Sequence, residues 1–173
     1  GFEAVVANNL TGGFLMMREV FNQSMQANGG AIVNMTADFR NGMPGMAHSG
    51  AARAGMSNLT MSAAYEWAHA GVRVNAVSPG WVASSGMDTY GGAVKAMIPK
   101  LKGHVPLRRL ASEAEVSAAI AFLLSPGAAF ITGVTLQIDG GASLGNPMFP
   151  SLDHNRSVAF DGFHRAVTPE VLK

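Results

Sequence analysis

Residues 72–80 read VRVNAVSPG, and the fold can be worked out from this stretch. Residues 72–77 are rich in β-branched side chains, which predicts a short buried strand, and Ser78-Pro79-Gly80 closes it as a turn. A helical pattern over residues 49–69 precedes this strand and ends at Gly71. Residues 31–35, AIVNM, predict another strand before the helix. The order strand, helix, strand predicts a crossover unit of a parallel sheet.

The same alternation continues on both sides of this unit. Ser112 and Glu115 have the spacing of a capping box, so a helix is expected to begin at Glu113. The stretch 81–110 is rich in Gly and Pro and predicts irregular chain with one short helix. The further expected elements are helices at 3–25, 94–101 and 113–124 and a strand at 134–138. The expected fold class is therefore α/β, with three parallel strands and flanking helices.

Composition excludes several classes of protein. The chain has 173 residues, is 48% hydrophobic, carries a net charge of +1 and contains no Cys. Disorder, a disulfide scaffold, thiolate catalysis and Cys-based zinc sites are excluded, and Lys and Arg form no continuous run that would predict a nucleic-acid partner. The five His residues show no metal-ligand spacing, so no metal is expected. The charged fraction is only 13%, about half of the usual ~25%, which predicts that part of the surface is covered by other protein.

No segment of the sequence predicts a membrane span. The charge-free stretch between Glu115 and Asp139 is broken at Ser125-Pro126-Gly127, and neither half is long enough to cross a bilayer. The start, GFEAVVANNL, lacks the features of a signal peptide, and Lys173 is no peroxisomal address. We therefore expect no membrane partner and a cytoplasmic location.

Several short segments, in this order, resemble the C-terminal half of the short-chain dehydrogenase/reductase family. They are NLTG at 9–12, GAIVN at 30–34, HSGAARAG at 48–55, VRVNAVSPG at 72–80, ITG at 131–133 and DGG at 139–141. The enoyl-CoA reductase and 2,4-dienoyl-CoA reductase branch is the most similar. The resemblance implies a Rossmann-like doubly wound parallel sheet, of which residues 1–143 form the C-terminal half. Residues 144–173 are then an extension, either at a subunit interface or loosely ordered.

The resemblance also implies NADP(H) or NAD(H) as cofactor. The chain contains no Gly-x-Gly-x-x-Gly motif, so the phosphate cradle is expected before Gly1. By the same resemblance, Asn9 holds a water in a proton relay and Arg53 binds the nicotinamide ribose. The residues expected at the cofactor are Met35, Thr36, Arg53, Pro79, Gly80, Val82 and Ser84. Those expected at the substrate are Phe39, Trp81 and Met87.

The sequence departs from the family pattern at the proton donor. Aligned on the motif ARAG, the family Tyr falls at Ser49 and the family Lys at Arg53, an i, i+4 pair on one helix face. A serine hydroxyl is a weak acid, so Ser49 needs a second group to supply the proton. The resemblance to the dienoyl-CoA reductases, which have an acid on the preceding loop, implies Asp38 for this role, and His48 is the other candidate. A His at a helix start also often caps or packs, and that alternative stays open.

The predicted function is reduction of the C=C bond of an enoyl thioester or related enone by hydride transfer from a nicotinamide. The missing Tyr and Lys leave two alternatives: a catalytically silent family member that acts as an oligomer subunit, and an inactive truncated fragment. Small residues on the helix at 49–69 predict close helix packing, and the family resemblance implies a homodimer or homotetramer acting on a small-molecule substrate.

Overall fold

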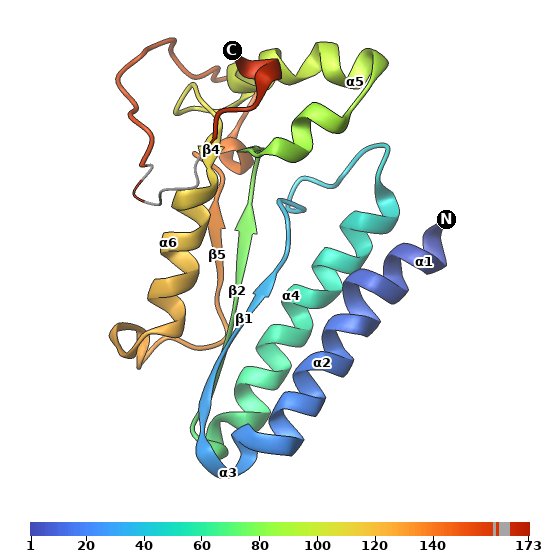
Figure 1. The fold of residues 1–173 in the computed structure, drawn as a ribbon, viewed down its shortest axis with the longest axis vertical. Coiled ribbons are helices and arrows are strands. Elements are labelled where there is room, and N and C mark those ends of the chain that lie inside the picture. The colour runs from blue at the N-terminus through green and yellow to red at the C-terminus, as the bar shows by residue number, and fades with distance from the viewer. Residues whose placement is uncertain (161, 163–166) are drawn as a thin grey trace. The chain divides into compact units, whose positions relative to one another are not determined.

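The computed structural model describes residues 1–160, 162 and 167–173 (Figure 1). It contains two compact units. The first comprises Gly1–Ser78 and Ile120–Gln137, and the second comprises Pro79–Ala119 and Ile138–Lys173. Most of the main sheet belongs to the first unit, and most of the Gly- and Pro-rich stretch belongs to the second.

The main sheet has the strand order β1-β2-β5, with β1 at Gly30–Met35, β2 at Val72–Pro79 and β5 at Thr135–Ile138. β1 and β2 are parallel, and their register runs from Gly30 opposite Val72 to Met35 opposite Val77. β5 is also parallel to β2, because the Ala76 amide donates to the Val134 carbonyl and the Gly80 amide to the Ile138 carbonyl. The expected α/β class with three parallel strands is confirmed.

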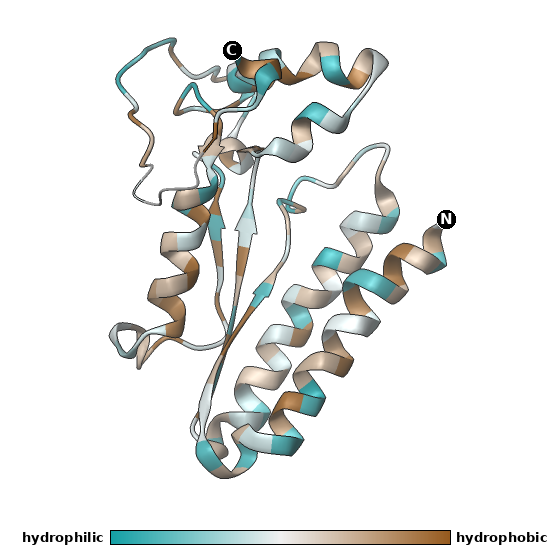
Figure 2. Ribbon diagram, viewed as in Figure 1, coloured by the Kyte–Doolittle hydropathy of each residue, from teal (hydrophilic) through white to brown (hydrophobic). Residues whose placement is uncertain are grey.

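β2 is the central strand, and its sequence explains why. All of its residues from Val74 to Ser78 are buried, as a parallel strand covered on both faces requires. Figure 2 colours the strands by the hydropathy of their residues. The polar Asn75 is tolerated because its side chain bonds the chain that leads into β5: Nδ2 donates to the Ile131 carbonyl and Oδ1 accepts from the Val134 amide.

The first helix and α4 lie together on one side of the sheet (Figure 1). The first helix comprises α1 at Phe2–Val6, α2 at Gly12–Val20 and α3 at Gln26–Asn28, joined by π-helical turns at Ala7–Thr11 and Phe21–Met25. α4 runs over Ala47–Trp67 and continues as a 3₁₀ turn at Ala68–Ala70. Phe21 stacks on Trp67 with ring centroids 4.4 Å apart. Left-handed glycines end both helices, Gly29 at φ 69° and Gly71 at φ 72°.

The second unit is built around a small apolar cluster of Met87, Ile98, Leu101 and Leu110. Two 3₁₀ helices, at Ser85–Thr89 and Ile98–His104, supply Met87, Ile98 and Leu101. The short helix α5, Gly92–Met97, precedes the second of them. A two-stranded parallel sheet pairs β3, Val82–Ala83, with β4, Ala111–Ser112. The stretch 81–110 is thus more regular than the sequence predicts, because its apolar residues are far apart in the sequence and pack together only in the folded unit.

α6 spans Glu113–Leu124, the range predicted from the capping box. Both capping bonds are present, since the Ser112 amide donates to Glu115 Oε2 at 2.8 Å and the Glu115 amide donates to Ser112 Oγ at 3.2 Å. Further 3₁₀ turns lie at Pro126–Ala128, Ala142–Leu144 and Glu170–Leu172. Within the described residues, no helix is long and apolar enough to cross a membrane.

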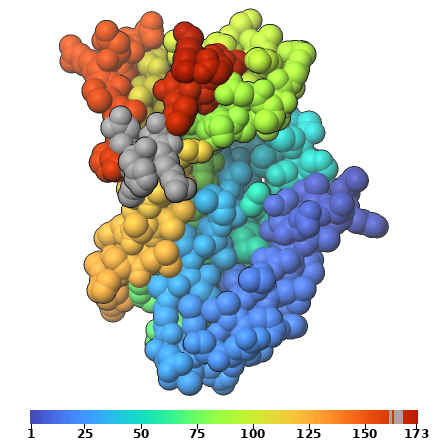
Figure 3. Space-filling view, viewed as in Figure 1, coloured from blue at the N-terminus to red at the C-terminus, as the bar shows by residue number. Residues whose placement is uncertain are grey.

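The C-terminal chain packs on its own unit. Val171 and Leu172 lie against the apolar cluster, and the Asp88 carboxylate accepts hydrogen bonds from the Glu170 and Val171 amides. Figure 3 shows these residues, in red, against the yellow-green residues of the same unit. The predicted role of residues 144–173 at a subunit interface stays a prediction.

Candidate active site

The carboxyl end of β1 and the first turns of α4 bring together two of the predicted residues. Arg53 projects from α4 and its Nη1 donates to the Met35 carbonyl at 2.8 Å. Its Nε is buried and has no hydrogen-bond partner among the described residues. Burial lowers the pKa of Arg53, although a guanidinium remains charged at neutral pH. A fixed cation with one unused donor therefore lies at the end of β1.

Ser49 lies one helical turn before Arg53 on the same helix, as the spacing predicts. Its amide donates to His48 Nδ1 at 2.7 Å. A neutral His48 ring with Nδ1 as acceptor carries its proton on Nε2, where it can act as a donor. Asp38 accepts a long hydrogen bond of 3.4 Å from the Arg40 amide. His48 is thus tied directly to Ser49, whereas the recorded contact of Asp38 is within its own loop.

Thr36 is fully engaged with β2. Its hydroxyl and its amide both donate to the Val77 carbonyl, at 2.9 and 2.8 Å. The hydroxyl can therefore accept a hydrogen bond from a ligand, but its proton is already used. The side chain of Met35 is 45% exposed, and Phe39 is half-buried in the loop that follows.

Asn9 lies within the π-helical turn Ala7–Thr11, where the Gly12 amide donates five residues back to the Ala7 carbonyl. Such wide turns interrupt the normal helix ladder and occur frequently at functional sites. The sequence predicts a helix here and gives no signal for the wide turn. The role of Asn9 in a proton relay stays a prediction, and the local backbone is compatible with it.

The end of β2 carries a polar side chain, Ser78, that the sequence does not predict as a site residue. The Ser78 side chain is fully buried, and its hydroxyl has no hydrogen-bond partner in the described part of the chain. Buried hydroxyls are rarely left unpaired, so this one is a candidate ligand contact. Its place directly before Pro79-Gly80 is the signal that could have found it.

Gly80 is required by a neighbour in its own unit. A Cβ at this position would lie 2.9 Å from the Asp139 Cβ and 3.0 Å from its Cα. The Asp139 carboxylate in turn accepts from the Gly141 and Ser143 amides, at 2.9 Å each. Burial raises the pKa of Asp139, but hydrogen bonds from the Ser143 side chain and from the Ser143 and Gly141 amides outweigh burial and hold the pKa below its usual value. A close backbone approach therefore accounts for glycine here, whether or not a ligand also needs it.

The remaining predicted residues lie in the second unit. Val82 is in β3, Ser84 precedes a 3₁₀ helix, and Trp81 is 42% exposed. Met87 is buried in the apolar cluster, which is where a core residue would lie. Its predicted contact with substrate stays a prediction. The described residues contain no cluster of His, Asp and Glu that could hold a metal ion.

Comparison with known proteins identifies the family. Residues 1–143 match the profile of a family described as enoyl-(acyl carrier protein) reductase. The chain is 33% identical over 148 residues to peroxisomal 2,4-dienoyl-CoA reductase of Pongo abelii, covering 84% of this chain and 50% of that protein. The chain belongs to the short-chain dehydrogenase/reductase family. The resemblance seen in the sequence is thereby confirmed.

Solved structures of the short-chain dehydrogenase/reductase family agree. The chain is 63% identical to citronellol catabolism dehydrogenase of Pseudomonas aeruginosa PAO1, with a TM-score of 0.72, covering 83% of this chain and 54% of that one. An NAD⁺-bound xylitol dehydrogenase is 33% identical, with a TM-score of 0.73, covering 81% and 59%. The chain spans about half the length of these relatives.

Membership of this family makes the chain part of an oxidoreductase fold whose members generally use NAD(P)(H). The residues present fit such a cofactor. Arg53 offers a buried Nε without a partner and Ser78 a buried hydroxyl without one, both within the portion described by the structure. Each is an orphaned polar atom that a ribose or a carboxamide could satisfy.

Proposed function

We propose that this chain forms the nicotinamide-side half of an NAD(P)-dependent reductase that acts on the C=C bond of an enoyl thioester or a related enone. The observation that carries the proposal is the arrangement of Ser49 and Arg53 on one turn of α4, with Arg53 anchored to the end of β1. The similarity to a dienoyl-CoA reductase supports the substrate class.

In this proposal the bound cofactor supplies a hydride to the β-carbon of the substrate. Arg53 donates from Nε to a ribose hydroxyl, a hydrogen bond that satisfies its buried donor. Within the second unit, backbone groups of Pro79, Gly80, Val82 and Ser84 would meet the nicotinamide. Within the first unit, the backbone at Asn9 would hold the relay water.

The chain's own residues must also handle charge and a proton. Hydride addition to the β-carbon places negative charge on the thioester oxygen, and the α-carbon then takes a proton. The Nε2–H of His48 and the hydroxyl of Ser49 are the donors offered to that oxygen. An enolate needs only a weak acid, so the absence of the family Tyr is tolerated better here than in a carbonyl reductase.

Oxidation of an unsaturated alcohol is the second candidate, because the chain is 63% identical to a citronellol catabolism dehydrogenase. That reaction requires a base to remove the hydroxyl proton. His48 is poorly placed to take this proton, because its Nδ1 already accepts from the Ser49 amide and Nε2 then carries a proton of its own. Reduction of the C=C bond is preferred, because it needs only a weak acid, whereas oxidation of an alcohol needs a base.

The test is turnover by the complete gene product that contains this chain. We expect crotonyl-CoA to be reduced with consumption of NADPH or NADH, followed by nicotinamide absorbance, and Ser49→Ala with His48→Gln to lower kcat at least tenfold. Oxidation of citronellol without reduction of crotonyl-CoA would replace the proposal with the second candidate. Cofactor binding without turnover of either substrate would indicate a silent family member.

The cytoplasmic location and the homodimer or homotetramer stay predictions.

A further inference from the structure

Basic residues are concentrated in the second unit. Residues 89–112 contain five of the chain's 12 Lys and Arg residues and no Asp or Glu. They are Lys95, Lys100, Lys102, Arg108 and Arg109. The apolar side chains of this stretch are buried in the cluster of Met87, Ile98, Leu101 and Leu110, whereas its lysines are exposed. The result is a positively charged outer surface on the short helices.

A pocket of about 570 Å³ opens on this surface. One wall comes from the 3₁₀ helix at Ile98–His104 and the loop after it, with Lys100, Lys102 and Arg108. The other wall comes from the C-terminal chain, with His154, Asn155 and Ser157. The volume is in the range of about 300–1,000 Å³ that is common for small-molecule sites.

Arg108 joins the two walls. Its guanidinium donates to the Gly103 carbonyl at 2.6 Å, to the Leu152 carbonyl at 3.1 Å and to the Ser151 carbonyl. Its backbone has φ of 57°, a conformation that non-glycine residues rarely adopt. The chain thus accepts backbone strain to hold this cation in place, which is typical of functional positions.

The charge of the pocket is positive after its acid is counted. Asp153 is its acidic residue, lies 3.6 Å from Arg108 and has a side chain that is 96% exposed. Both ring nitrogens of His154 are held by the chain, since Nε2 contacts the Pro106 carbonyl and Nδ1 accepts from the Arg156 amide. Lys100 and Lys102 are the cations that remain free to meet a ligand, since the described residues show no ion pair for either.

We propose that this pocket binds the 3′-phosphorylated adenosine diphosphate end of coenzyme A, which carries the acyl substrate. The inference rests on the proposed function for the thioester substrate. Two lysines and a fixed arginine match a polyanion with separate phosphate groups, and the volume accommodates a nucleotide rather than a single phosphate. Asn155 and Ser157 add polar side chains to the same wall.

The test is calorimetric titration of the complete protein with coenzyme A and with dephospho-coenzyme A, which lacks the 3′-phosphate. Saturating NADPH is present throughout, so that the nucleotide cofactor site is filled. We expect coenzyme A to bind at least tenfold more tightly, a preference that Lys100→Gln with Lys102→Gln abolishes. The matched control is Lys95→Gln, an exposed lysine of the same stretch that does not line the pocket.

Equal affinity for the two ligands would overturn the inference, as would a loss in Lys95→Gln as large as that in the double variant. Binding is measured without turnover, so it is independent of the reaction. Reduction of crotonyl-CoA without a 3′-phosphate preference would contradict coenzyme A binding in the pocket but support the proposed function. A 3′-phosphate preference without reduction of any enoyl thioester would support binding in the pocket and contradict the proposed function.

Discussion

Arg53 shows how one residue can keep a position while changing its chemistry. A lysine offers one flexible ammonium group, whereas the arginine uses Nη1 to bond the Met35 carbonyl and keeps a buried Nε that has no partner among the described residues. The bond to Met35 fixes the orientation of the planar guanidinium. Donation from this group to a ribose stays a proposal.

We predict that Arg53→Met raises the cofactor dissociation constant at least tenfold in the complete protein, because a charge-assisted hydrogen bond to the ribose is lost. Quenching of nicotinamide fluorescence measures it. Arg40→Met is the control, since Arg40 is an exposed cation of the same unit. Unchanged cofactor binding in Arg53→Met would remove the ribose role.

The family resemblance placed Ser49 and Arg53 at the candidate site, and helix geometry explains why the two lie one turn apart on α4. Their roles stay predictions. The Ser78 hydroxyl, which has no partner among the described residues, and the approach of Gly80 to Asp139 depend on chain segments that meet only after folding. No local pattern contains that information.

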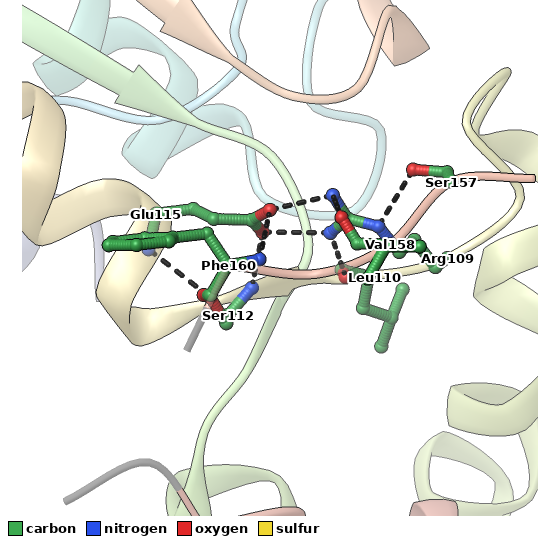
Figure 4. A network of polar contacts seen from close by, with 7 residues as sticks. All are labelled: Arg109, Leu110, Ser112, Glu115, Ser157, Val158 and Phe160. Atoms are coloured by element: carbon green, nitrogen blue, oxygen red, sulfur yellow. Dashed lines mark hydrogen bonds and ion pairs between the residues drawn. The ribbon is translucent and has the colours of Figure 1, made fainter. Parts of the chain in front are cut away.

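At the scale of elements, the start of α6 is stabilised by a network of hydrogen bonds around the Glu115 carboxylate. Arg109 forms two hydrogen bonds to the Glu115 carboxylate, at 2.8 and 2.6 Å (Figure 4). The Phe160 amide donates to the same carboxylate at 3.1 Å, and Arg109 Nε donates to Ser157 Oγ at 2.8 Å. The capping box thus also holds the C-terminal chain against α6.

This network predicts a pH dependence. Burial raises the pKa of Glu115, but the bonds from Arg109, Ser112 and Phe160 outweigh burial and lower it from 4.5 to about 2. The carboxylate therefore stabilises the fold above pH 4.5, and this stabilisation is lost as the pH falls from 4.5 toward about 2. Because the pair is partly exposed to solvent, we expect about 1–2 kcal/mol from it.

We predict that Glu115→Gln lowers the free energy of unfolding by about 1–2 kcal/mol at neutral pH and flattens its decline in acid. Urea unfolding at a series of pH values measures both effects. Glu113→Gln is the matched control, because Glu113 is exposed in the same first turn of α6. An equal loss in both variants would mean that the helix dipole, not the network, supplies the stability.

At the level of elements, periodicity and caps located the long helices and the strands well. The two π-helical turns of the first helix and the pair β3 and β4 were not expected. A π turn is set by packing against a neighbouring helix, and a two-residue strand has too few residues to show a period.

For the whole molecule, exposed apolar side chains agree with the low charged fraction. On α4, Met61 and Tyr65 lie one turn apart and are 50% and 88% exposed. On the first helix, Phe14, Leu15 and Met16 are exposed as well. The sequence-based expectation that other protein covers part of this surface is consistent with these exposed apolar side chains.

We predict that the complete protein is a homodimer or homotetramer and that Met61→Glu with Tyr65→Glu shifts it toward monomer, because charge would be buried in the interface. Sedimentation velocity reports the oligomeric state. Glu66→Gln is the control, as it changes an exposed neighbour without adding charge. A wild-type protein that sediments only as a monomer would contradict the prediction.

The amino-acid order was enough for the α/β class with three parallel strands, the start of α6 and the family, because these follow from local periodicity, caps and short motifs. Folding was needed to bury Met87, to leave the Ser78 hydroxyl without a partner among the described residues, and to assemble the basic pocket from the 3₁₀ helix and the C-terminal chain. Such features arise from contacts between residues far apart in the chain, and a linear pattern records which side chains are available but not which of them meet.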